Sequence, residues 1–469
     1  MPTGLTLCNR EDSCGSLGLE SPSLRLYRGT PIVIASNFAR KTIVVIGNGM
    51  VGHRFCERLV EFDTAHQFRI VTFCEEPRAA YDRVGLTSFF AHRDAEQLML
   101  ARKEWYLEHG VELHIGDRAC ELNRETKTVR SQKGVQIDYD ICVMATGSYP
   151  FVPSIPGIQN RGVFVYRTIE DLNHIIEYSQ HAKQCAVIGG GLLGLEAAKA
   201  AYDLGLETHV VVLGPRVLAR QLDDKASKTL VSKIETLGIH VLLDADTTEV
   251  LGNGQVEGLR FKDNSELAVD MVVVSAGIVP RDDLAKASGL NVGPRGGVVV
   301  DDHLRTSDPD IFAIGEVALH RSMVYGLVAP GYEMAEIVAA NLFDGAQRRV
   351  SDRIPVYALY VDPPLGRVGL SEAEARAKGH HVRIGVRPMT RVGRAVEKGE
   401  TRGFMKVVVD RDSDAILGAA IFGVGGDEAI HGVVEAMAAG VTATAYARVM
   451  AIHPTVSELV PTVFGDLSP

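Results

Sequence analysis

The sequence contains no pair of cysteines in a CxxC arrangement and no run of 18 apolar residues. Its seven cysteines are scattered and odd in number, which argues against the disulfide framework of a secreted protein and against a zinc or iron–sulfur site. The missing apolar run leaves no candidate for a membrane-spanning helix. The apolar stretch at 31–35 is too short for the core of a signal peptide. We therefore expect a cytoplasmic protein with no metal site and no membrane partner.

Positive charge is also scarce. The chain has 49 lysines and arginines but 59 acidic residues, which gives a formal net charge of −10. Such a balance disfavours nucleic acid as a partner. By contrast, glycine is abundant, with 47 residues, and 46% of the chain is hydrophobic, as is typical of α/β proteins with many tight turns. A length of 469 residues is about three times a domain of ~150 residues, so we expect two or three packed units.

An apolar run at 42–46, typical of a buried strand, leads into a glycine-rich turn and a helix-like segment. The turn reads Gly47-Asn48-Gly49-Met50-Val51-Gly52. In a dinucleotide-binding fingerprint the first glycine allows the tight turn, the second lets a pyrophosphate approach the backbone, and the third lets the helix pack on the strand. We expect this turn to bind a dinucleotide at a helix N-terminus, through Gly47, Gly49, Met50 and Gly52.

The next predicted strand, 69–73, ends at a cysteine followed by two glutamates. A carboxylate at this spacing after a fingerprint accepts hydrogen bonds from the ribose hydroxyls of the adenosine. Glu75 is the first candidate and Glu76 the second, and a solvated turn is the alternative interpretation for both.

A second strand at 185–188 leads into Gly189-Gly190-Gly191-Leu192-Leu193-Gly194 and a helix-prone segment. Two such units in one chain indicate two dinucleotides, the second bound through Gly189, Gly191, Leu192 and Gly194. The strand that follows, 208–213, has no acid at its end, and Arg216 and Arg220 come shortly after it. These arginines either meet the 2′-phosphate of NADPH or are solvated, so the choice between NADH and NADPH stays open.

Three further strand-like runs, at 141–147, 271–277 and 310–316, end at or next to a glycine. Because the third lies far downstream, we expect the chain to return to its first domain after completing the second. The predicted organisation is a poorly ordered tail at 1–40, a discontinuous first domain at 41–155 and 280–345, a second domain at 156–279, and an α+β unit at 350–469.

Together, the fingerprints, Ala145-Thr146-Gly147, Ala276-Gly277-Ile278 and Ile314-Gly315-Glu316 resemble the two-dinucleotide-binding flavoproteins of the pyridine nucleotide–disulfide oxidoreductase superfamily. Segments at 45–54, 81–84, 145–153 and 328–333 resemble the FAD and NAD(P)H module of assimilatory nitrite reductase large subunits. Segments at 366–375, 403–406 and 452–458 are similar to the dimerisation domain of mercuric-reductase-like and dihydrolipoamide-dehydrogenase-like enzymes. The resemblance implies an α/β fold with Rossmann-like FAD and NAD(P) domains and a C-terminal α+β dimerisation domain.

The resemblance also implies roles for single residues. Glu316 would bond the ribityl chain of FAD, and Glu196 would lie beside the nicotinamide. A buried strand that ends in a carboxylate needs a hydrogen-bonding partner, and a ribityl hydroxyl supplies one for Glu316. The other implied FAD or dinucleotide contacts are Arg83, Thr146, Gly147, Gly277 and Gly315. The alternative for each of these residues is a position at a strand end or on a helix surface.

At some positions this chain has a different residue type from the families that it resembles. A histidine and an acid usually stand where this chain has Gly85 and Val212. The segment 81–88 contains no cysteine where the disulfide reductases carry a CxxxxC pair, which excludes disulfide reduction by that route. A replacement pair from Cys8 and Cys14 in the tail is disfavoured. The CxxC ligands of the iron–sulfur and siroheme domains of nitrite reductases are absent from the sequence as well.

In the dimeric relatives a histidine and a glutamate, here His453 and Glu458, reach into the partner subunit and serve thiol chemistry. They are either a catalytic pair or a retained interface pair. Three other cysteines, Cys56, Cys142 and Cys185, fall within predicted helix or strand and are expected to be small core residues.

These observations predict a homodimeric FAD-dependent NAD(P)H oxidoreductase. It would pass hydride from NAD(P)H to FAD and electrons on to a small-molecule or redox-protein acceptor that the sequence does not identify. The alternative is a flavin- and nucleotide-binding protein that senses redox state, or is degenerate, and does not turn over.

Overall fold

The computed structural model describes residues 40–219, 221–222, 224–345, 347–352, 354–359 and 363–468. The predicted tail at 1–40, with Cys8 and Cys14, falls outside these residues except for Arg40. Arg220 also lies outside them.

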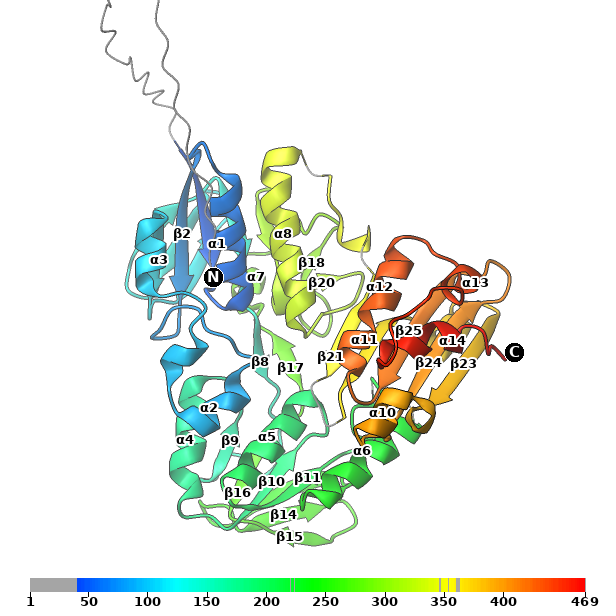
Figure 1. The fold of residues 1–469 in the computed structure, drawn as a ribbon. Helices are drawn as coiled ribbons and strands as arrows, with labels where there is room; N and C mark the ends of the chain where they lie inside the picture. Colours follow the sequence, from blue (N-terminus) through cyan, green and yellow to red (C-terminus); the bar gives the residue numbers. More distant parts are fainter. Residues whose placement is uncertain are drawn as a thin grey trace, which may run out of the picture. The chain divides into compact units, whose positions relative to one another are not determined.

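The first half is built on a parallel five-stranded sheet in the order β19-β7-β1-β2-β3 (Figure 1). The apolar run of the first fingerprint forms the central strand, and its residues from Ile43 to Ile46 are buried, as a strand covered on both faces requires. Helices α1 and α8 pack against each other beside this sheet. The bounds are β1 (Lys41–Ile46), β2 (Phe68–Cys74), β3 (Val111–Ile115), β7 (Ile141–Met144), β19 (Ile311–Ala313), α1 (Met50–Phe62) and α8 (Val328–Asp344).

The second half repeats this architecture with a parallel sheet in the order β12-β11-β10-β16-β9. Helix α5 contacts strands β10 and β11. The bounds are β9 (Val163–Val165), β10 (Gln184–Ile188), β11 (Glu207–Val211), β12 (His240–Leu242), β16 (Met271–Val274), α4 (Ile169–Ser179), α5 (Leu192–Asp203) and α6 (Asp224–Thr236).

Small sheets and short helices complete the two halves. Strand β8, which directly follows β7 of the first sheet, pairs antiparallel with β17, which directly follows β16 of the second. The bounds are β4 (Ala119–Asn123), β5 (Thr128–Ser131), β6 (Gln136–Asp138), β8 (Ser148–Pro150), β13 (Thr247–Leu251), β14 (Gly258–Phe261), β15 (Glu266–Ala268), β17 (Ile278–Pro280), β18 (Val298–Val300), β20 (Ala318–His320), α2 (Leu86–His92), α3 (Lys103–Glu108), α7 (Asp283–Ala287), η1 (Ala95–Leu98), η2 (Gly315–Val317) and η3 (Val350–Asp352).

The C-terminal unit is an antiparallel sheet in the order β21-β22-β25-β24-β23 with its own apolar core under short helices. Two of its phenylalanines, Phe404 and Phe422, belong to the same apolar cluster as Leu218 and Leu222 of the second half. The bounds are β21 (Val356–Leu359), β22 (Leu365–Gly369), β23 (Val382–Pro388), β24 (Phe404–Asp410), β25 (Ile416–Phe422), α9 (Glu372–Ala377), α10 (Gly393–Glu397), α11 (Gly426–Ala429), α12 (His431–Ala438), α13 (Ala443–Tyr446), α14 (Val460–Val463), η4 (Met389–Arg391) and η5 (Ser457–Leu459).

The expected fold class, α/β with a C-terminal α+β unit, is confirmed. Cys56, Cys142 and Cys185 are buried as predicted, and burial raises the pKa of the Cys56 thiol to about 12. Across the described ranges, no helix is both long enough and apolar enough to span a membrane. The same residues contain no group of three or more histidine, cysteine or acidic side chains placed to hold a metal ion.

Candidate dinucleotide-binding and redox site

The first glycine turn has the geometry that its sequence predicts. Gly47 has a φ of +106°, and a Cβ atom there would lie 2.4 Å from the carbonyl oxygen of Ala145. A Cβ on Gly52 would lie 2.0 Å from the carbonyl oxygen of Gly47, so the start of helix α1 packs directly on the turn. A Cβ on Gly49, in contrast, would meet no atom within 4 Å. The turn is therefore closed at its first and third glycines and open at its second, as phosphate binding requires.

The second turn repeats this arrangement. Gly189 has a φ of +131°, and a Cβ there would lie 2.1 Å from the carbonyl oxygen of Ser275. A Cβ on Gly194 would lie 2.0 Å from the carbonyl oxygen of Gly189, whereas a Cβ on Gly191 would meet nothing within 4 Å.

Both turns lead into helices whose N-termini are free to bind an anion. Helices α1 and α5 begin after Gly49 and Gly191, which provide no capping side chain, and neither helix has an acidic residue in its first turn. The first backbone N–H groups of a helix have no partner within the helix, and the helix dipole favours negative charge there. The two N-termini thus fit the pyrophosphates of two dinucleotides.

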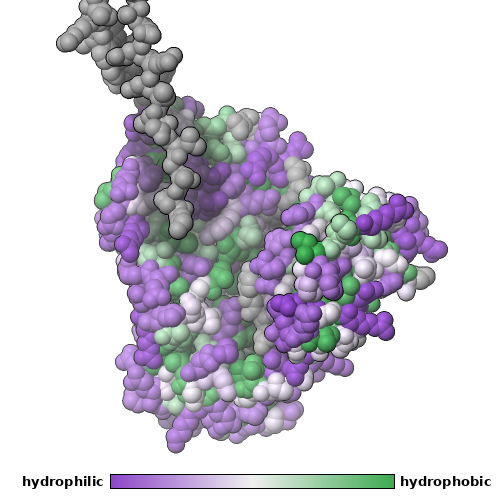
Figure 2. Space-filling view, in the orientation of Figure 1, coloured by the Kyte–Doolittle hydropathy of each residue, from purple (hydrophilic) through white to green (hydrophobic). Residues whose placement is uncertain are grey.

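Both turns line a single cleft of about 2230 Å³. One small-molecule site usually occupies ~300–1,000 Å³, so this cleft has room for more than one ligand. In Figure 2, green apolar surface is visible in the hollowed middle of the molecule, between purple hydrophilic rims. The candidate residues that line the cleft are Gly47, Gly49, Met50, Glu75, Arg83, Thr146, Gly147, Gly189, Gly191, Leu192, Glu196, Arg216, Gly277, Gly315 and Glu316.

The two glutamates at the end of β2 have different partners. Glu75 forms an ion pair with Arg281, and the Nη1 atom of Arg118 lies 3.7 Å from its other carboxylate oxygen. Glu76 accepts a 2.8 Å hydrogen bond from the hydroxyl of Tyr81 and forms an ion pair with Arg83. Both glutamates line the cleft, so the geometry permits either to meet a ribose.

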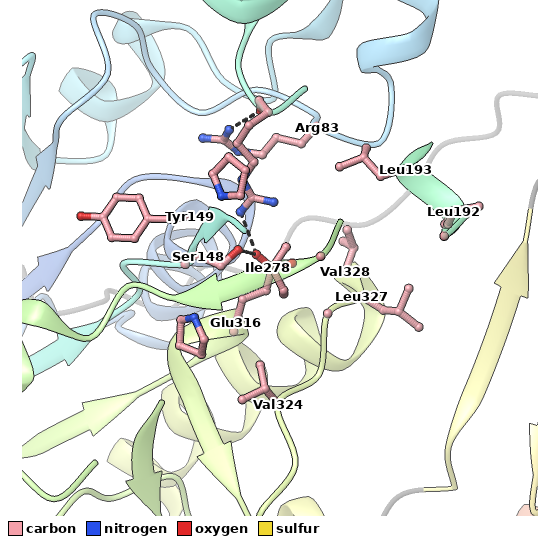
Figure 3. Close-up of a pocket in the computed structure, with 18 of the residues that line it drawn as sticks. Arg83, Ser148, Tyr149, Leu192, Leu193, Ile278, Glu316, Val324, Leu327 and Val328 are labelled. Carbon is pink, nitrogen blue, oxygen red and sulfur yellow. Dashed lines mark hydrogen bonds and ion pairs between the residues drawn. The ribbon is translucent and has the colours of Figure 1, made fainter. Parts of the chain in front are cut away.

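Glu316 lies where the two halves meet (Figure 3). Its Oε2 atom accepts a 2.6 Å hydrogen bond from the hydroxyl of Ser148 and a 2.7 Å bond from the guanidinium of Arg167. Arg83 donates a 2.9 Å hydrogen bond to the main-chain carbonyl oxygen of Arg167. Arg167 therefore joins two residues that the sequence assigned separately to the flavin.

Three further residues that line the cleft were not predicted from the sequence, and they are Arg167, Arg281 and Ser148. A weak signal existed for Arg167, because Thr168 and Asp171 form a capping box at the start of α4 and place the preceding residue at a helix N-terminus. The ion pairs of Arg167 and Arg281 span 149 and 206 positions of the chain, and no local pattern reports them.

Main-chain contacts join the two strand-end glycines that were assigned to the cofactors. The hydroxyl of Thr146 donates a 2.7 Å hydrogen bond to the carbonyl oxygen of Arg281, and the N–H of Arg281 donates to Gly147 at 2.9 Å. The N–H of Phe151 donates to the carbonyl oxygen of Gly277 at 2.8 Å. The ribbon of β8 and β17 thus holds the segments around Gly147 and Gly277 at the same cleft.

Glu196 projects from α5 into the wall of the cleft. Burial raises the pKa of its carboxyl from 4.5 to about 7. No described side chain donates a hydrogen bond to this carboxyl or pairs with it. An unpaired, half-buried carboxyl in a ligand cleft is typical of a functional position.

The five residues that directly follow β11, positions 212–216, include no acid. Val212 is buried and Leu213 is 71% exposed. Arg216 lines the cleft, and its Nη1 atom lies 2.8 Å from the carboxylate of Asp224 at the start of α6. The candidate ligand of a 2′-phosphate is therefore already paired with an acid.

His453 and Glu458 form a pair but are not among the described residues that line the cleft. The Nδ1 atom of His453 lies 2.8 Å from the Glu458 carboxylate, and the imidazole is 81% exposed. Three apolar side chains just before it in the chain, Val449, Met450 and Ile452, are also exposed.

The C-terminal unit supplies a third wall of the cleft, which the sequence did not predict. Polar side chains on this wall come from β21, β22, α11 and α12, and they are Tyr357, Arg367, Asp427 and His431.

Two parallel sheets whose glycine turns open into one cleft define the class of α/β proteins that bind two dinucleotides. The chain belongs to the pyridine nucleotide-disulphide oxidoreductase family, whose model matches residues 41–339, and the dimerisation-domain model of that family matches residues 356–464. It is accordingly an FAD-dependent pyridine nucleotide oxidoreductase, and its cofactors are FAD and NAD(P)H.

The chain is similar to parts of nitrite and nitrate reductase subunits. The chain is 43% identical over 390 residues to the nitrite reductase (NADH) large subunit of Escherichia coli strain K12, covering 81% of this chain and 44% of that protein. It is 36% identical over 304 residues to the assimilatory nitrate reductase electron transfer subunit of Bacillus subtilis strain 168, covering 65% and 39%. The chain thus spans less than half the length of these two curated relatives.

A solved structure shares the fold over most of the chain. The NAD-dependent persulfide reductase from A. fulgidus superposes with a TM-score of 0.81 at 23% identity, covering 90% of this chain and 82% of that one.

Proposed function

We propose that this chain passes a hydride from NAD(P)H to FAD where its two halves meet, and passes the electrons on to a separate acceptor. The observation that supports the proposal most strongly is that two glycine turns, each open at its second glycine and uncapped, line one cleft. The first turn would hold FAD and the second NAD(P)H.

The residues of the first half would hold FAD at three points. Glu75 would accept hydrogen bonds from the adenosine ribose, and the N-terminus of α1 would face the pyrophosphate. Glu316, held by Ser148 and Arg167, would meet the ribityl chain, because its second carboxylate oxygen accepts from neither of these residues. When bound, FAD accepts the hydride and stores both electrons until the acceptor takes them.

Glu196 would act on the nicotinamide side. A hydride that leaves a nicotinamide leaves positive charge behind, and a nearby carboxylate stabilises charge of that sign. Because the pKa of Glu196 is raised to about 7, this carboxyl changes charge in the neutral range. Ionised Glu196 would therefore favour hydride transfer, and its protonated form would not.

For the acceptor, we propose a redox protein or a small oxidant. The B. subtilis relative named as an electron transfer subunit supports a redox protein. A homodimer is supported by the match to the dimerisation domain and by the exposed apolar side chains of Val449, Met450 and Ile452.

Anaerobic titration of the purified protein tests the proposal. NADH, NADPH or both should bleach the visible absorbance of bound flavin, with about one equivalent of nucleotide per flavin. A protein that retains flavin but is reduced only over many minutes would instead support the alternative of a redox sensor without turnover. The Gly191→Val variant is the control, because its side chain would enter the second turn and should abolish reduction without removing FAD.

A further inference from the structure

Arg281 is the first residue after β17, the short strand that begins directly after Gly277. Its main chain is fixed on both sides to the first half. The N–H donates to the carbonyl oxygen of Gly147, and the carbonyl oxygen accepts from the hydroxyl of Thr146. The backbone of Arg281 therefore has little freedom, and its side chain starts from a defined point at the edge of the cleft.

The side chain of Arg281 runs from this point to the carboxylate of Glu75. Its guanidinium lies 4.5 Å from the ring centroid of Tyr149 and pairs with the Oε2 atom of Glu75. Arg118 approaches the other carboxylate oxygen at 3.7 Å and donates a 3.4 Å hydrogen bond to the hydroxyl of Tyr149. Arg281 is the more buried of the two arginines, with a side chain that is 25% exposed against 42% for Arg118.

We propose that Arg281 is a positioning residue for the adenosine end of FAD, because it holds the Glu75 carboxylate in the orientation that binds the ribose. This inference rests on the proposed role of Glu75. A carboxylate offers about four lone-pair sites, so it can accept from a guanidinium and from ribose hydroxyls at the same time. Glu75 is 40% exposed and has no other partner that fixes it as closely as Arg281 among the described residues.

At position 281, arginine has chemical properties that lysine cannot reproduce. A planar guanidinium can stack on a tyrosine ring and donate to a carboxylate from its edge, whereas the ammonium of lysine is a compact charge on a flexible stem. Lysine should therefore keep the charge at this position but lose the orientation of Glu75.

The test is the affinity of the flavin-free protein for FAD, measured by quenching of FAD fluorescence. The variants are Arg281→Met, Arg281→Lys, Glu75→Gln and the double variant Glu75→Gln/Arg281→Met. The matched control is Arg69→Met, which removes another arginine of the first half that is paired with a glutamate, Glu112, and neither of these two residues lines the cleft.

We expect Arg281→Met to raise the dissociation constant for FAD about tenfold and Arg281→Lys to raise it about threefold, with Arg69→Met unchanged. In the Glu75→Gln background, Arg281→Met should change the constant less than twofold, because its target is gone. Thermal unfolding of each flavin-free variant checks that the fold is kept, and Arg281→Lys carries the test if Arg281→Met does not fold.

Wild-type affinity in Arg281→Met, or an undiminished effect of Arg281→Met in the Glu75→Gln background, would overturn the inference. These outcomes leave the proposed hydride transfer intact, because the wild-type protein would still bind FAD. A wild-type protein that does not bind FAD would instead contradict the proposed function itself.

Discussion

The α-carbon of Gly52 lies so close to Gly47 that a Cβ atom on Gly52 would stand 2.0 Å from the Gly47 carbonyl oxygen. Real Cβ atoms do not approach a carbonyl oxygen so closely, so the start of α1 tolerates only glycine here. Three residues earlier, Gly49 has open space at the same place and an ordinary φ of −81°. The same motif therefore contains one glycine needed for folding and one needed for binding.

This difference predicts opposite effects for two alanine substitutions. Gly52→Ala should destabilise the fold by about 3 kcal/mol or prevent folding, because helix α1 must move away from the turn. Gly49→Ala should leave the unfolding temperature of the flavin-free protein unchanged and raise the dissociation constant for FAD at least tenfold, because the methyl group enters the space for the pyrophosphate. Thermal unfolding and FAD content measure the two effects. A destabilised Gly49→Ala protein would contradict the assignment.

Glu196 should make flavin reduction depend on pH. Burial raises its pKa to about 7, so the fraction of ionised carboxylate increases between about pH 6 and pH 8. We expect the rate of flavin reduction by NADH in stopped flow to rise through this range. Glu196→Gln should be slower by about tenfold and independent of pH there. An unchanged pH profile in Glu196→Gln would show that another group titrates.

The same carboxyl should affect stability. Its pKa is higher in the fold than the value of 4.5 that it takes when unfolded, so the folded state binds more protons between these values. The free energy of unfolding should therefore fall as pH rises from about 4.5 to about 7 and stay reduced above it. At pH 8 compared with pH 5, Glu196→Gln should gain about 2 kcal/mol relative to the wild type, measured by urea unfolding of the flavin-free protein.

Arg167 should be needed to hold the flavin site together. Arg167→Met removes a 2.7 Å bond to Glu316 and leaves this half-buried carboxylate with Ser148 alone. We expect the dissociation constant for FAD to rise about tenfold or more, since a hydrogen bond to a charged group contributes ~1.5–3 kcal/mol. Ser148→Ala should have a smaller effect. If the wild type and Arg167→Met bound FAD equally well, Glu316 would not need Arg167 in order to bind FAD.

The exposed apolar side chains near His453 predict a subunit interface. Met450 is 95% exposed, and Met450→Asp should convert a dimer into a monomer in analytical ultracentrifugation, because burying an unpaired carboxylate at an interface is costly. Leu107→Asp is the control, because Leu107, on α3 of the first half, is also an exposed apolar residue, at 79%. A Met450→Asp protein that remains dimeric would place the interface elsewhere.

The pairing of Arg216 with Asp224 predicts how nucleotide preference can be changed. Asp224→Asn should free the guanidinium for a 2′-phosphate and lower the KM for NADPH about threefold to tenfold, with little effect on the KM for NADH. Glu235→Gln is the control on the same helix, α6. Equal changes for both nucleotides would indicate a general effect on the rim rather than a contact with the phosphate.

The sequence predicted the parts of the site whose geometry is local. The glycine spacing of each turn and the glutamates after β2 belong to a strand, a turn and a helix that are contiguous in the chain. The first two glycines of each turn and both glutamates line the cleft, whereas Gly52 and Gly194 pack against the turns instead. The partners of these glutamates could not be predicted, because Arg281 reaches Glu75 across 206 positions. The third wall around His431 was missed for the same reason, since it depends on how the C-terminal unit packs on the second half.

The central claim is tested most directly by single-turnover reduction of the flavin with NAD(P)H that carries deuterium at the position of the transferred hydrogen. We predict complete bleaching of the flavin under anaerobic conditions, with a rate severalfold lower for the deuterated nucleotide than for the ordinary one. A flavin that stays oxidised after both NADH and NADPH are added would contradict the account.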